Sequence, residues 1–592
     1  MMKRILFFLV LCSFFMADKL SAYNKTLPLQ STELKKIASG DFVLTNKGTC
    51  ELRKYNSDFT KVLKVLEFEQ VPTGLAVTDE YFYVTTFTSK GELHKVDAKT
   101  FKVVDRLELQ SGAIYPVLTQ DKQTLYVANQ FSNTISKVDL KNFTLVASVG
   151  VDREPRCFVL SRDEKQMFVA NFLPNQRADV DHVSAKVSVV DTEKFEVVKN
   201  IELANGSNAL NGITLSPDGK YVLVTHNMGR FYYLWFSISG GWMNTAVVSV
   251  IETKNLAYHG VVILDEEHQG AATPERIAVT EDKILITHSG SHELSIIDYK
   301  PFIDRVEAYK DKEKMEVDLT ILSGIRKRLP LKGNGPKILE LVGDKAYIPT
   351  YFSDTLNVVD IKSKQIDVCY ALQTHRQESD EFLGERIFND ARYCYEQWRS
   401  CSGCHPGGAR HDGMNWDLMN DGPGNSKSCK SLLFSYDTAP SMISGIRASA
   451  DIATRKGFEQ SQYFDISESD AVLVDIYLAN MPQVPSPYLV DGKLSAKAEK
   501  GKEVFEKIGC ISCHSGEYYT DCLMHRIGDE KDIEQADGWD TPTLREVWRT
   551  APYLFDGRAK TMKDVFVEFK HGVYTQVSDS DIDNLVEYVK SL

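Results

Sequence analysis

The sequence predicts a multidomain protein, in which an all-β seven-bladed propeller is followed by two small all-α domains. Two observations lead to this prediction. Short strands with period-two alternation recur over residues 23–372, and Cys-x-x-Cys-His begins at Cys401 and again at Cys510, each time between segments with apolar residues at helical spacing. We therefore expect the propeller over residues 23–372 and the helical domains over residues 378–488 and 492–592.

The N-terminal segment has the pattern of a secretory signal peptide. Basic residues precede an apolar run from Ile5 to Ala17, and small residues form a cleavage site that ends at Ala22. The run is shorter than the ~20 apolar residues that span a bilayer, which disfavours an uncleaved anchor. We expect residues 1–22 to be removed on export to the periplasm, and no membrane span to remain.

The propeller is predicted from an internal repeat. Each of six segments has a short β-branched run, a polar turn, and an alternating run that ends in Val or Ile followed by an acidic residue. These acidic residues are Asp97, Asp139, Asp191, Glu252, Asp298 and Asp360. Their spacing is typical of four-stranded propeller blades, and it argues against a β-sandwich or a β-solenoid. A degenerate copy from Phe42 brings the number of blades to seven.

Two of these strands resemble a known family. The stretches "YVTT" from Tyr83 and "YVAN" from Tyr126 are similar to the repeat of the YVTN-type β-propellers. The resemblance covers roughly residues 40–370 at the level of the repeat. It implies the fold and says little about function, because propellers host many functions.

The two Cys-x-x-Cys-His motifs predict two covalently bound haem c groups. Two cysteines at this spacing attach the porphyrin through thioether bonds, and the next histidine becomes the fifth ligand of the iron. A thioredoxin-like dithiol lacks its βαβ context here, and a zinc site lacks a second close pair of ligands. The haem-binding residues are Cys401, Cys404 and His405 in the first motif, and Cys510, Cys513 and His514 in the second.

The setting of each motif predicts a cytochrome-c-like domain. The first motif follows "ESDEFLGERIF" and precedes "SDAVLVDIYLAN", and the second follows "KLSAKAEKGKEVFEK" and precedes "DSDIDNLVEYVKSL". All four stretches have the amphipathic spacing of helices. Each domain should therefore consist of a helix, the haem motif, loops and a closing helix.

The sequence around the two Cys-x-x-Cys-His motifs resembles the bacterial di-haem cytochrome c peroxidase family, which includes the enzyme that matures methylamine dehydrogenase. The most specific stretch is "TPTLREVWRTAPYLFDGRAKT" from Thr541, and the likeness covers roughly residues 378–592. It implies two unequal haems, of which the N-terminal one is usually peroxidatic and the C-terminal one receives electrons. This chain departs from the family at Phe555, where the family has histidine, and at Phe569, near the place of the family's methionine ligand.

The function expected from these features is an exported di-haem oxidoreductase of the cytochrome c peroxidase type. It would reduce hydrogen peroxide with electrons from a small donor protein of the cytochrome or cupredoxin type. The alternatives are a non-catalytic electron carrier whose propeller docks a partner, and a peroxide-dependent maturation enzyme that oxidises Tyr or Trp of a partner. A substrate-oxidation site within the propeller is a weaker possibility. The net charge of −13 disfavours nucleic-acid partners.

Candidate sixth ligands are His571 for the second haem and Met442 for the first. His571 lies close to where the family places its distal ligand, and Gly572 after it permits close approach of the backbone. The alternative is that His571 merely ends a helix beside a glycine cap. Met562 and His525 are the next candidates for the second haem, and His411 is the next for the first.

Two further expectations concern the remaining side chains. A closed propeller places its first and last blades side by side, so Cys50 and Cys369 are predicted to form a disulfide, and Cys394 and Cys429 are another candidate pair.

Histidines also recur at equivalent points of two blades, at His226 and His288, with Arg230 and His292 nearby. They are interpreted as hydrogen-bonded turn residues, or alternatively as a polar cluster that faces the haem region.

Overall fold

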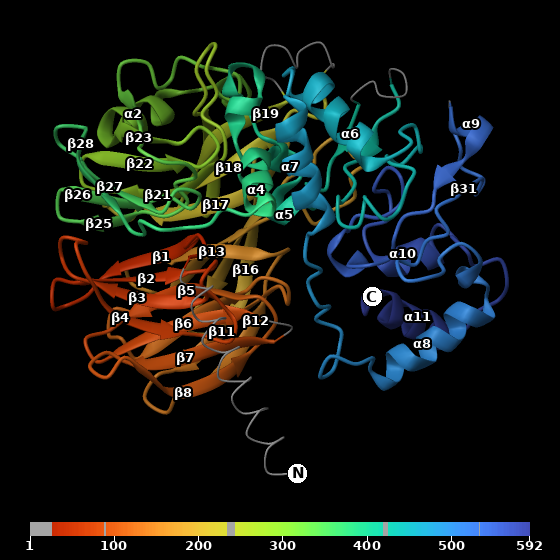
Figure 1. The fold of residues 1–592 in the computed structure, drawn as a ribbon, viewed down its shortest axis with the longest axis horizontal. Helices are drawn as coiled ribbons and strands as arrows, with labels where there is room; N and C mark the ends of the chain where they lie inside the picture. Colours follow the sequence, from red (N-terminus) through yellow and green to blue (C-terminus); the bar gives the residue numbers. More distant parts are fainter. Residues whose placement is uncertain (1–25, 88–89, 234–242, 418–423, 532) are drawn as a thin grey trace, which may run out of the picture.

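The computed structural model describes residues 26–87, 90–233, 243–417, 424–531 and 533–592, so the predicted signal peptide lies outside the described residues. Its β-rich part is a seven-bladed propeller of seven four-stranded antiparallel sheets (Figure 1). Each blade runs in chain order from its innermost to its outermost strand. The innermost strands of the first six blades contact one another in succession, and β25 of the last blade contacts β1 of the first.

The blades contain these strands. The first three are β1 (Ser31–Lys36), β2 (Phe42–Asn46), β3 (Glu51–Tyr55) and β4 (Val62–Glu67); β5 (Val71–Val77), β6 (Tyr81–Phe87), β7 (Gly91–Asp97) and β8 (Lys102–Leu109); β9 (Ala113–Leu118), β10 (Thr124–Asn129), β11 (Thr134–Asp139) and β12 (Thr144–Gly150). The next two are β13 (Pro155–Leu160), β14 (Gln166–Asn171), β15 (Lys186–Asp191) and β16 (Glu196–Glu202); β17 (Ser207–Leu215), β18 (Tyr221–Gly229), β19 (Asn244–Glu252) and β20 (Ala257–Ile263). The last two are β21 (Pro274–Val279), β22 (Lys283–His288), β23 (Glu293–Asp298) and β24 (Arg326–Pro330); β25 (Glu340–Val342), β26 (Lys345–Pro349), β27 (Thr355–Asp360) and β28 (Gln365–Ala371).

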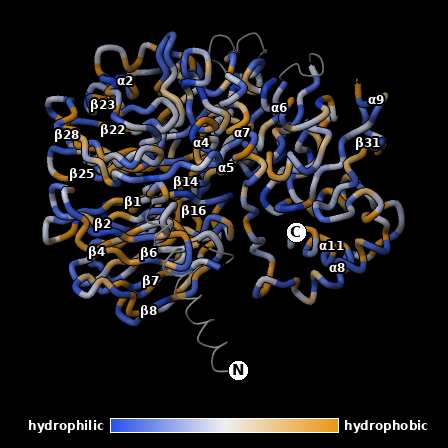
Figure 2. The backbone as a smooth tube through the Cα atoms, in the orientation of Figure 1, coloured by the Kyte–Doolittle hydropathy of each residue, from blue (hydrophilic) through white to orange (hydrophobic). Residues whose placement is uncertain are grey.

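The position of a strand within its blade decides how far that strand is buried. The middle strands are buried along almost their whole length, as in β10 and β14, whereas the outermost strands β12 and β16 are largely exposed. Figure 2 shows hydrophobic and hydrophilic stretches mixed throughout the propeller. The sixth blade also carries α2 (Tyr299–Ala308) and α3 (Lys312–Met315), which pack into the core that this blade shares with the fifth.

Two helical domains follow the propeller and lie beside it (Figure 1). The first contains α4 (Asp380–Phe388), α5 (Pro406–Ala409), α6 (Ala450–Lys456) and α7 (Glu468–Ala479), with the short strands β29 (Asn415–Trp416) and β30 (Lys427–Ser428). The second contains α8 (Ala496–Lys507), α9 (Glu534–Asp537), α10 (Met562–Val567) and α11 (Asp579–Lys590), with β31 (Met524–His525) and β32 (Trp539–Asp540). Within the described parts of the chain, no helix has the length and apolar character needed to cross a bilayer.

The same helix crossing builds both helical domains. In the first, α4 crosses α7 at Gly384, where a Cβ atom would lie 1.9 Å from the carbonyl oxygen of Leu473. In the second, α8 crosses α11 at Gly501, where a Cβ atom would lie 1.9 Å from the carbonyl oxygen of Asn584. Only glycine allows backbones to approach this closely. The two domains are therefore structural copies of one unit.

The predicted disulfides are not formed, because all ten described cysteines have free thiols. Tyr370 packs against Phe59 of the first blade, with ring centroids 5.7 Å apart. Successive strand residues face opposite sides of a sheet, so the neighbouring Cys369 points away from the first blade and from Cys50.

The pair Cys394 and Cys429 is also wrong. The thiol of Cys429 lies 3.2 Å from the carbonyl oxygen of Cys404 and 3.5 Å from Nδ1 of His405, so it packs beside the first haem motif.

Candidate haem sites

Both motif histidines are held in the same way. Nδ1 of His405 lies 3.0 Å from the carbonyl oxygen of Arg410, and Nδ1 of His514 lies 3.0 Å from that of Tyr519. A carbonyl oxygen only accepts, so Nδ1 carries the proton and Nε2 keeps the lone pair that binds a metal. Burial also lowers the pKa of both imidazoles, that of His514 to about 4, which keeps them in the neutral form that a metal requires.

The first motif borders a cavity. Its wall contains Cys401, Cys404, His405 and Met442, together with apolar side chains from α4, the α6 region and α7. These apolar residues include Phe388, Phe458, Val474 and Leu478. A largely apolar cavity that opens at two cysteines and a metal-ready imidazole has the composition expected of a haem pocket.

Three polar residues on the wall of this cavity test whether a haem fits. Nη2 of Arg399, Oγ of Ser441 and Oε1 of Gln462 are buried, and they have no hydrogen-bond partner among the described residues. Arg399 is only 4% exposed. A buried guanidinium without a counter-charge is costly, and the carboxylates of a haem would supply that charge. The residues present therefore fit the group.

The second motif faces a histidine across a gap. The ring centroids of His514 and His571 are 6.3 Å apart, and the ring planes are inclined by 63°. An imidazole nitrogen binds a first-row metal at about 2 Å, and the ring centre lies about 1 Å beyond that nitrogen, so two imidazoles on one metal have centroids roughly 6 Å apart. His571 and His514 are thus spaced so that both could bind the iron of a haem attached at Cys510 and Cys513.

The backbone beside His571 reaches the porphyrin attachment point. Gly572 has φ 68°, and a Cβ atom there would lie 3.9 Å from Sγ of Cys510. The amide nitrogen of His571 donates to the carbonyl oxygen of Val565 in α10, at 3.0 Å. The segment is therefore anchored to α10 and passes over the haem-attachment turn.

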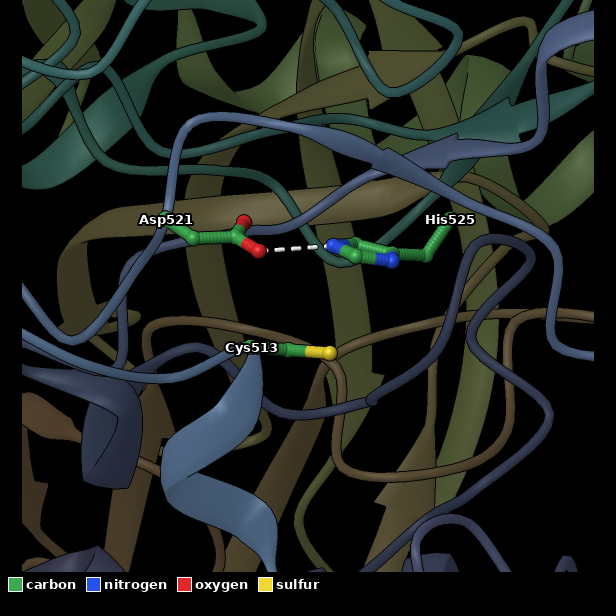
Figure 3. A group of neighbouring side chains, drawn as sticks. All are labelled: Cys513, Asp521 and His525. Carbon is green, nitrogen blue, oxygen red and sulfur yellow. Dashed lines mark hydrogen bonds and ion pairs between the residues drawn. The ribbon is translucent and has the colours of Figure 1, made fainter.

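The other candidates for the second haem are placed differently. Met562 is buried in the core of its domain. Nε2 of His525 is 2.7 Å from Oδ2 of Asp521, and these two side chains lie beside Cys513 (Figure 3). The three ligand atoms lie within 4.8 Å of one another. A thioether bond to the porphyrin would use the Cys513 sulfur, which leaves a pair rather than a metal site.

Of the two candidates for the first haem, only Met442 borders the cavity. Met442 has φ 74°, and its loop matches the loop of Leu554, with φ 70°, in the second domain. His411 is placed elsewhere: Nδ1 accepts from the amide of Gly413 at 3.2 Å, and Nε2 faces Arg153 at 3.2 Å. The expectation that His411 could serve as a ligand is therefore not supported.

The propeller contributes to the first site through the strand β19. Nδ2 of Asn244 donates to Sγ of Cys404 at 3.1 Å, and Met243 lines the cavity. A long insertion in the fifth blade separates β18 from β19, and its residues 234–242 lie outside the described residues. Neither Asn244 nor Met243 was predicted, because nothing in the local sequence indicates where this insertion ends in space.

The histidines of the propeller have structural roles. Nε2 of His226 bonds Oγ of Ser249 at 2.8 Å, and Nε2 of His288 bonds Oγ of Ser295 at 2.9 Å. Both histidines are fully buried within β18 and β22, so they are hydrogen-bonded as expected, but the expectation that they are turn residues was wrong.

The two residues noted beside these histidines, Arg230 and His292, also make polar contacts. His292 contacts Asp390 of the first helical domain at 3.1 Å, and Arg230 donates to Thr245 at 3.2 Å.

Comparison with known proteins agrees with both parts of this architecture. The model of the YNCE-like beta-propeller family matches residues 70–194, and that of cytochrome c matches residues 498–592. The chain therefore contains a propeller and a cytochrome c domain, and the latter implies covalently bound haem c.

Two curated relatives and one solved structure extend this comparison. Hydrazine synthase subunit gamma of Kuenenia stuttgartiensis is 25% identical over 271 residues, which cover 35% of this chain and 76% of that protein. Methylamine utilization protein MauG of Methylophilus methylotrophus is 30% identical over 92 residues, 13% of this chain and 28% of that protein. The structure of Kuenenia stuttgartiensis hydrazine synthase is similar with a TM-score of 0.52 at 22% identity, over 57% of this chain and 97% of that one, a likeness of fold alone.

Proposed function

We propose that this protein is an exported di-haem c-type oxidoreductase in which the first haem reacts with hydrogen peroxide and the second supplies the electrons. The observation that carries this proposal is the difference between the two sites. His514 faces His571 at a spacing that suits one iron, whereas His405 borders a cavity in whose wall the candidate ligand is the thioether of Met442. Bis-histidine sites favour electron transfer, and an open or weakly bound face favours reaction.

The residues of the first site have distinct proposed roles. A haem bound there supplies an iron that can take up a small oxidant and pass electrons to it. Cys401 and Cys404 hold the porphyrin edge, and the carbonyl oxygen of Arg410 keeps Nε2 of His405 free to bind. Arg399 balances negative charge within the cavity.

The electrons are proposed to come from a small periplasmic protein of the cytochrome or cupredoxin type. The motif of the second haem lies near the surface, because Ile511 between its cysteines is 49% exposed. An exposed porphyrin edge shortens the distance over which a docked donor must transfer an electron. The likeness to MauG over 92 residues supports a haem redox function of this general kind.

Visible and EPR spectra of the protein with both haems attached, recorded before and after addition of peroxide, test the proposal. We expect one low-spin bis-histidine haem that does not change ligands and one haem that reacts. Two unreactive six-coordinate haems in every redox state would favour the electron-carrier alternative. A reactive haem with poor turnover of small donors would favour a maturation enzyme that acts on a protein.

A second candidate function is a reaction that forms or consumes hydrazine at the same first site. The relative named hydrazine synthase subunit gamma matches this chain over 76% of its own length, which favours this candidate. Titration of the protein with hydrazine separates the two. A spectral change of the first haem with hydrazine, and none with peroxide, would replace the peroxidase proposal.

A further inference from the structure

We propose that the buried ion pair between Arg410 and Glu546 positions the proximal ligand of the first haem, His405, and ties that ligand to the second helical domain and the propeller. This inference rests on the proposed binding of a haem at His405. It goes beyond the proposed function because it assigns a tuning role to residues outside the haem pocket.

The starting point is the hydrogen bond that His405 makes. Its Nδ1–H donates to the carbonyl oxygen of Arg410 at 3.0 Å. The strength of this bond sets how much negative character the imidazole has, and hence how strongly it donates to a metal. The turn before Arg410 contains Gly407 and Gly408 at φ 68° and 82°, so no regular helix holds the accepting carbonyl in place. The amide of Arg410 donates to the carbonyl oxygen of Pro406 at 3.2 Å, and the arginine side chain adds a second anchor.

The side chain of Arg410 supplies this anchor. Its Nε and Nη2 atoms bind the two carboxylate oxygens of Glu546 at 2.9 and 2.8 Å, and the side chains of these two residues are 6% and 2% exposed. Nη2 also donates to the carbonyl oxygen of Pro482 at 3.0 Å, and Nη1 donates to that of Gly408 at 2.6 Å. A bidentate, buried pair of this kind is directional, so it fixes the orientation of the arginine as well as its charge.

Glu546 belongs to the second helical domain and is itself held firmly. It adopts φ 57°, a left-handed conformation that costs a non-glycine residue free energy. Its amide nitrogen donates to the carbonyl oxygen of Leu592 at 3.1 Å, and its carboxylate also accepts from the amide of Val484 at 2.9 Å. The carboxylate is thus presented to Arg410 from a rigid, strained turn.

The chain of charges continues into the propeller. Three residues after Glu546, Arg549 binds both oxygens of Glu154 at 2.9 and 3.0 Å. Glu154 follows the third blade, and Gln130 donates to it at 2.7 Å. Nη1 of Arg549 also lies 3.6 Å from Oε1 of Glu546, so Arg410, Glu546, Arg549 and Glu154 form an alternating buried chain that contains residues of all three domains.

Among the described residues, no such chain reaches the second haem site. The carbonyl that accepts from His514 belongs to Tyr519, whose hydroxyl lies 3.2 Å from that of Tyr588 in α11. This contact stays within the second domain. A device that acts only on the first haem, the proposed reactive one, suits a protein in which the two haems have different tasks.

Glu546→Gln tests the inference, because it keeps the shape of the side chain and removes the charge. Two readouts are needed: the reduction potential of each haem, and the iron–histidine stretching band of the reduced first haem. We expect the hydrogen bond to His405 to weaken, the band to move to lower frequency, and the reduction equilibrium of the first haem to change about tenfold, ~59 mV for one electron. The second haem should not change.

Asp390→Asn is the matched control. Asp390 is a buried carboxylate at the border between the propeller and the first helical domain, 3.1 Å from His292, and it is not part of the charge chain. This variant should leave both potentials unchanged. An equal shift in Asp390→Asn and Glu546→Gln would show a general effect of loosened domains and would overturn the inference.

Other outcomes are also decisive. Two attached haems in Glu546→Gln with an unchanged first potential and band would overturn the inference alone. A single haem in the unmodified protein would instead overturn the proposed function. If Glu546→Gln does not fold, Arg410→Lys keeps the charge and loses the bidentate geometry. The same shift is expected of it, and its absence would count against the inference.

Discussion

The imidazole rings of His514 and His571 face each other with centroids 6.3 Å apart, although the two residues belong to separate loops of the second helical domain. This spacing suits two ligands of one iron, and under the proposed function the first haem, beside its cavity, is the reactive one. His571→Ala should therefore abolish the low-spin bis-histidine EPR signal of the second haem. His525→Ala is the control, because His525 bonds Asp521 instead, and the signal should survive there. An unchanged signal in His571→Ala would show that another ligand binds.

Two covalent haems are expected per chain. The double variant Cys510→Ala with Cys513→Ala should lose one haem by mass spectrometry, and Cys401→Ala with Cys404→Ala should lose the other. A colourless, zinc-containing product from the unmodified sequence would contradict this prediction.

The thiols of Cys50 and Cys369 should be free in the exported protein. The double variant Cys50→Ala with Cys369→Ala should therefore change the free energy of unfolding by no more than about 1 kcal/mol, since a lost disulfide typically costs 2–5 kcal/mol. Urea unfolding, with thiol labelling of the unmodified protein, measures both quantities. A larger loss of unfolding free energy, or a failure to label either thiol, would show that the disulfide does form.

Met442→Ala should shift the first haem toward high spin and speed its reaction with peroxide, because a weak thioether would no longer compete for the iron. Leu554→Ala changes the matching loop of the second domain and should leave the first haem as it is. Stopped-flow spectra after mixing with peroxide distinguish the two variants. Identical spectra for Met442→Ala and the unmodified protein would mean that the first haem uses another ligand or none.

Gly501→Ala should destabilise the second helical domain by about 3 kcal/mol or more, because the added Cβ would overlap the carbonyl oxygen of Asn584 at 1.9 Å. Gly150→Ala is the control. No atom lies within 4 Å of a Cβ at Gly150, so the change in the free energy of unfolding should stay within about 0.5 kcal/mol. Denaturant midpoints compare the two. Equal midpoints would show that α8 and α11 do not cross so closely.

The contact between Glu154 and Arg549 should make stability depend on acid. Burial opposes ionisation of Glu154, but Arg549 and Arg153 outweigh it and lower the pKa to about 2 from an ordinary value of 4.5. A carboxyl group whose pKa is lower in the folded than in the unfolded protein stabilises the fold fully when the pH is above its pKa in the unfolded protein. It loses that effect as the pH falls to its pKa in the folded protein. Between pH 5 and pH 2, the free energy of unfolding of the unmodified protein should therefore fall by up to about 3 kcal/mol more than that of Glu154→Gln, which lacks the carboxylate at every pH. Acid-unfolding curves of the unmodified protein and of Glu154→Gln that run parallel would contradict this prediction.

Local patterns predicted much of the architecture. The alternating runs that end at acidic residues such as Asp97 and Asp139 predicted seven blades, and the seven four-stranded sheets confirm it. This worked because strand alternation and blade turns depend on residues close together in the chain. The disulfide between Cys50 and Cys369 was wrong for the complementary reason: neighbouring blades do meet there, but the pleat directs Cys369 to the other face.

The sequence by itself determined which residues can attach haem, because two cysteines and a histidine need only their own spacing to meet a porphyrin edge. Only the tertiary structure decided what surrounds each haem motif. It brought His571 opposite His514, left Arg399 buried at the cavity without a hydrogen-bond partner for Nη2 among the described residues, and joined Arg410 to Glu546. Such contacts link residues far apart in the chain. Their positions depend on how whole domains pack, which no local pattern of residues encodes.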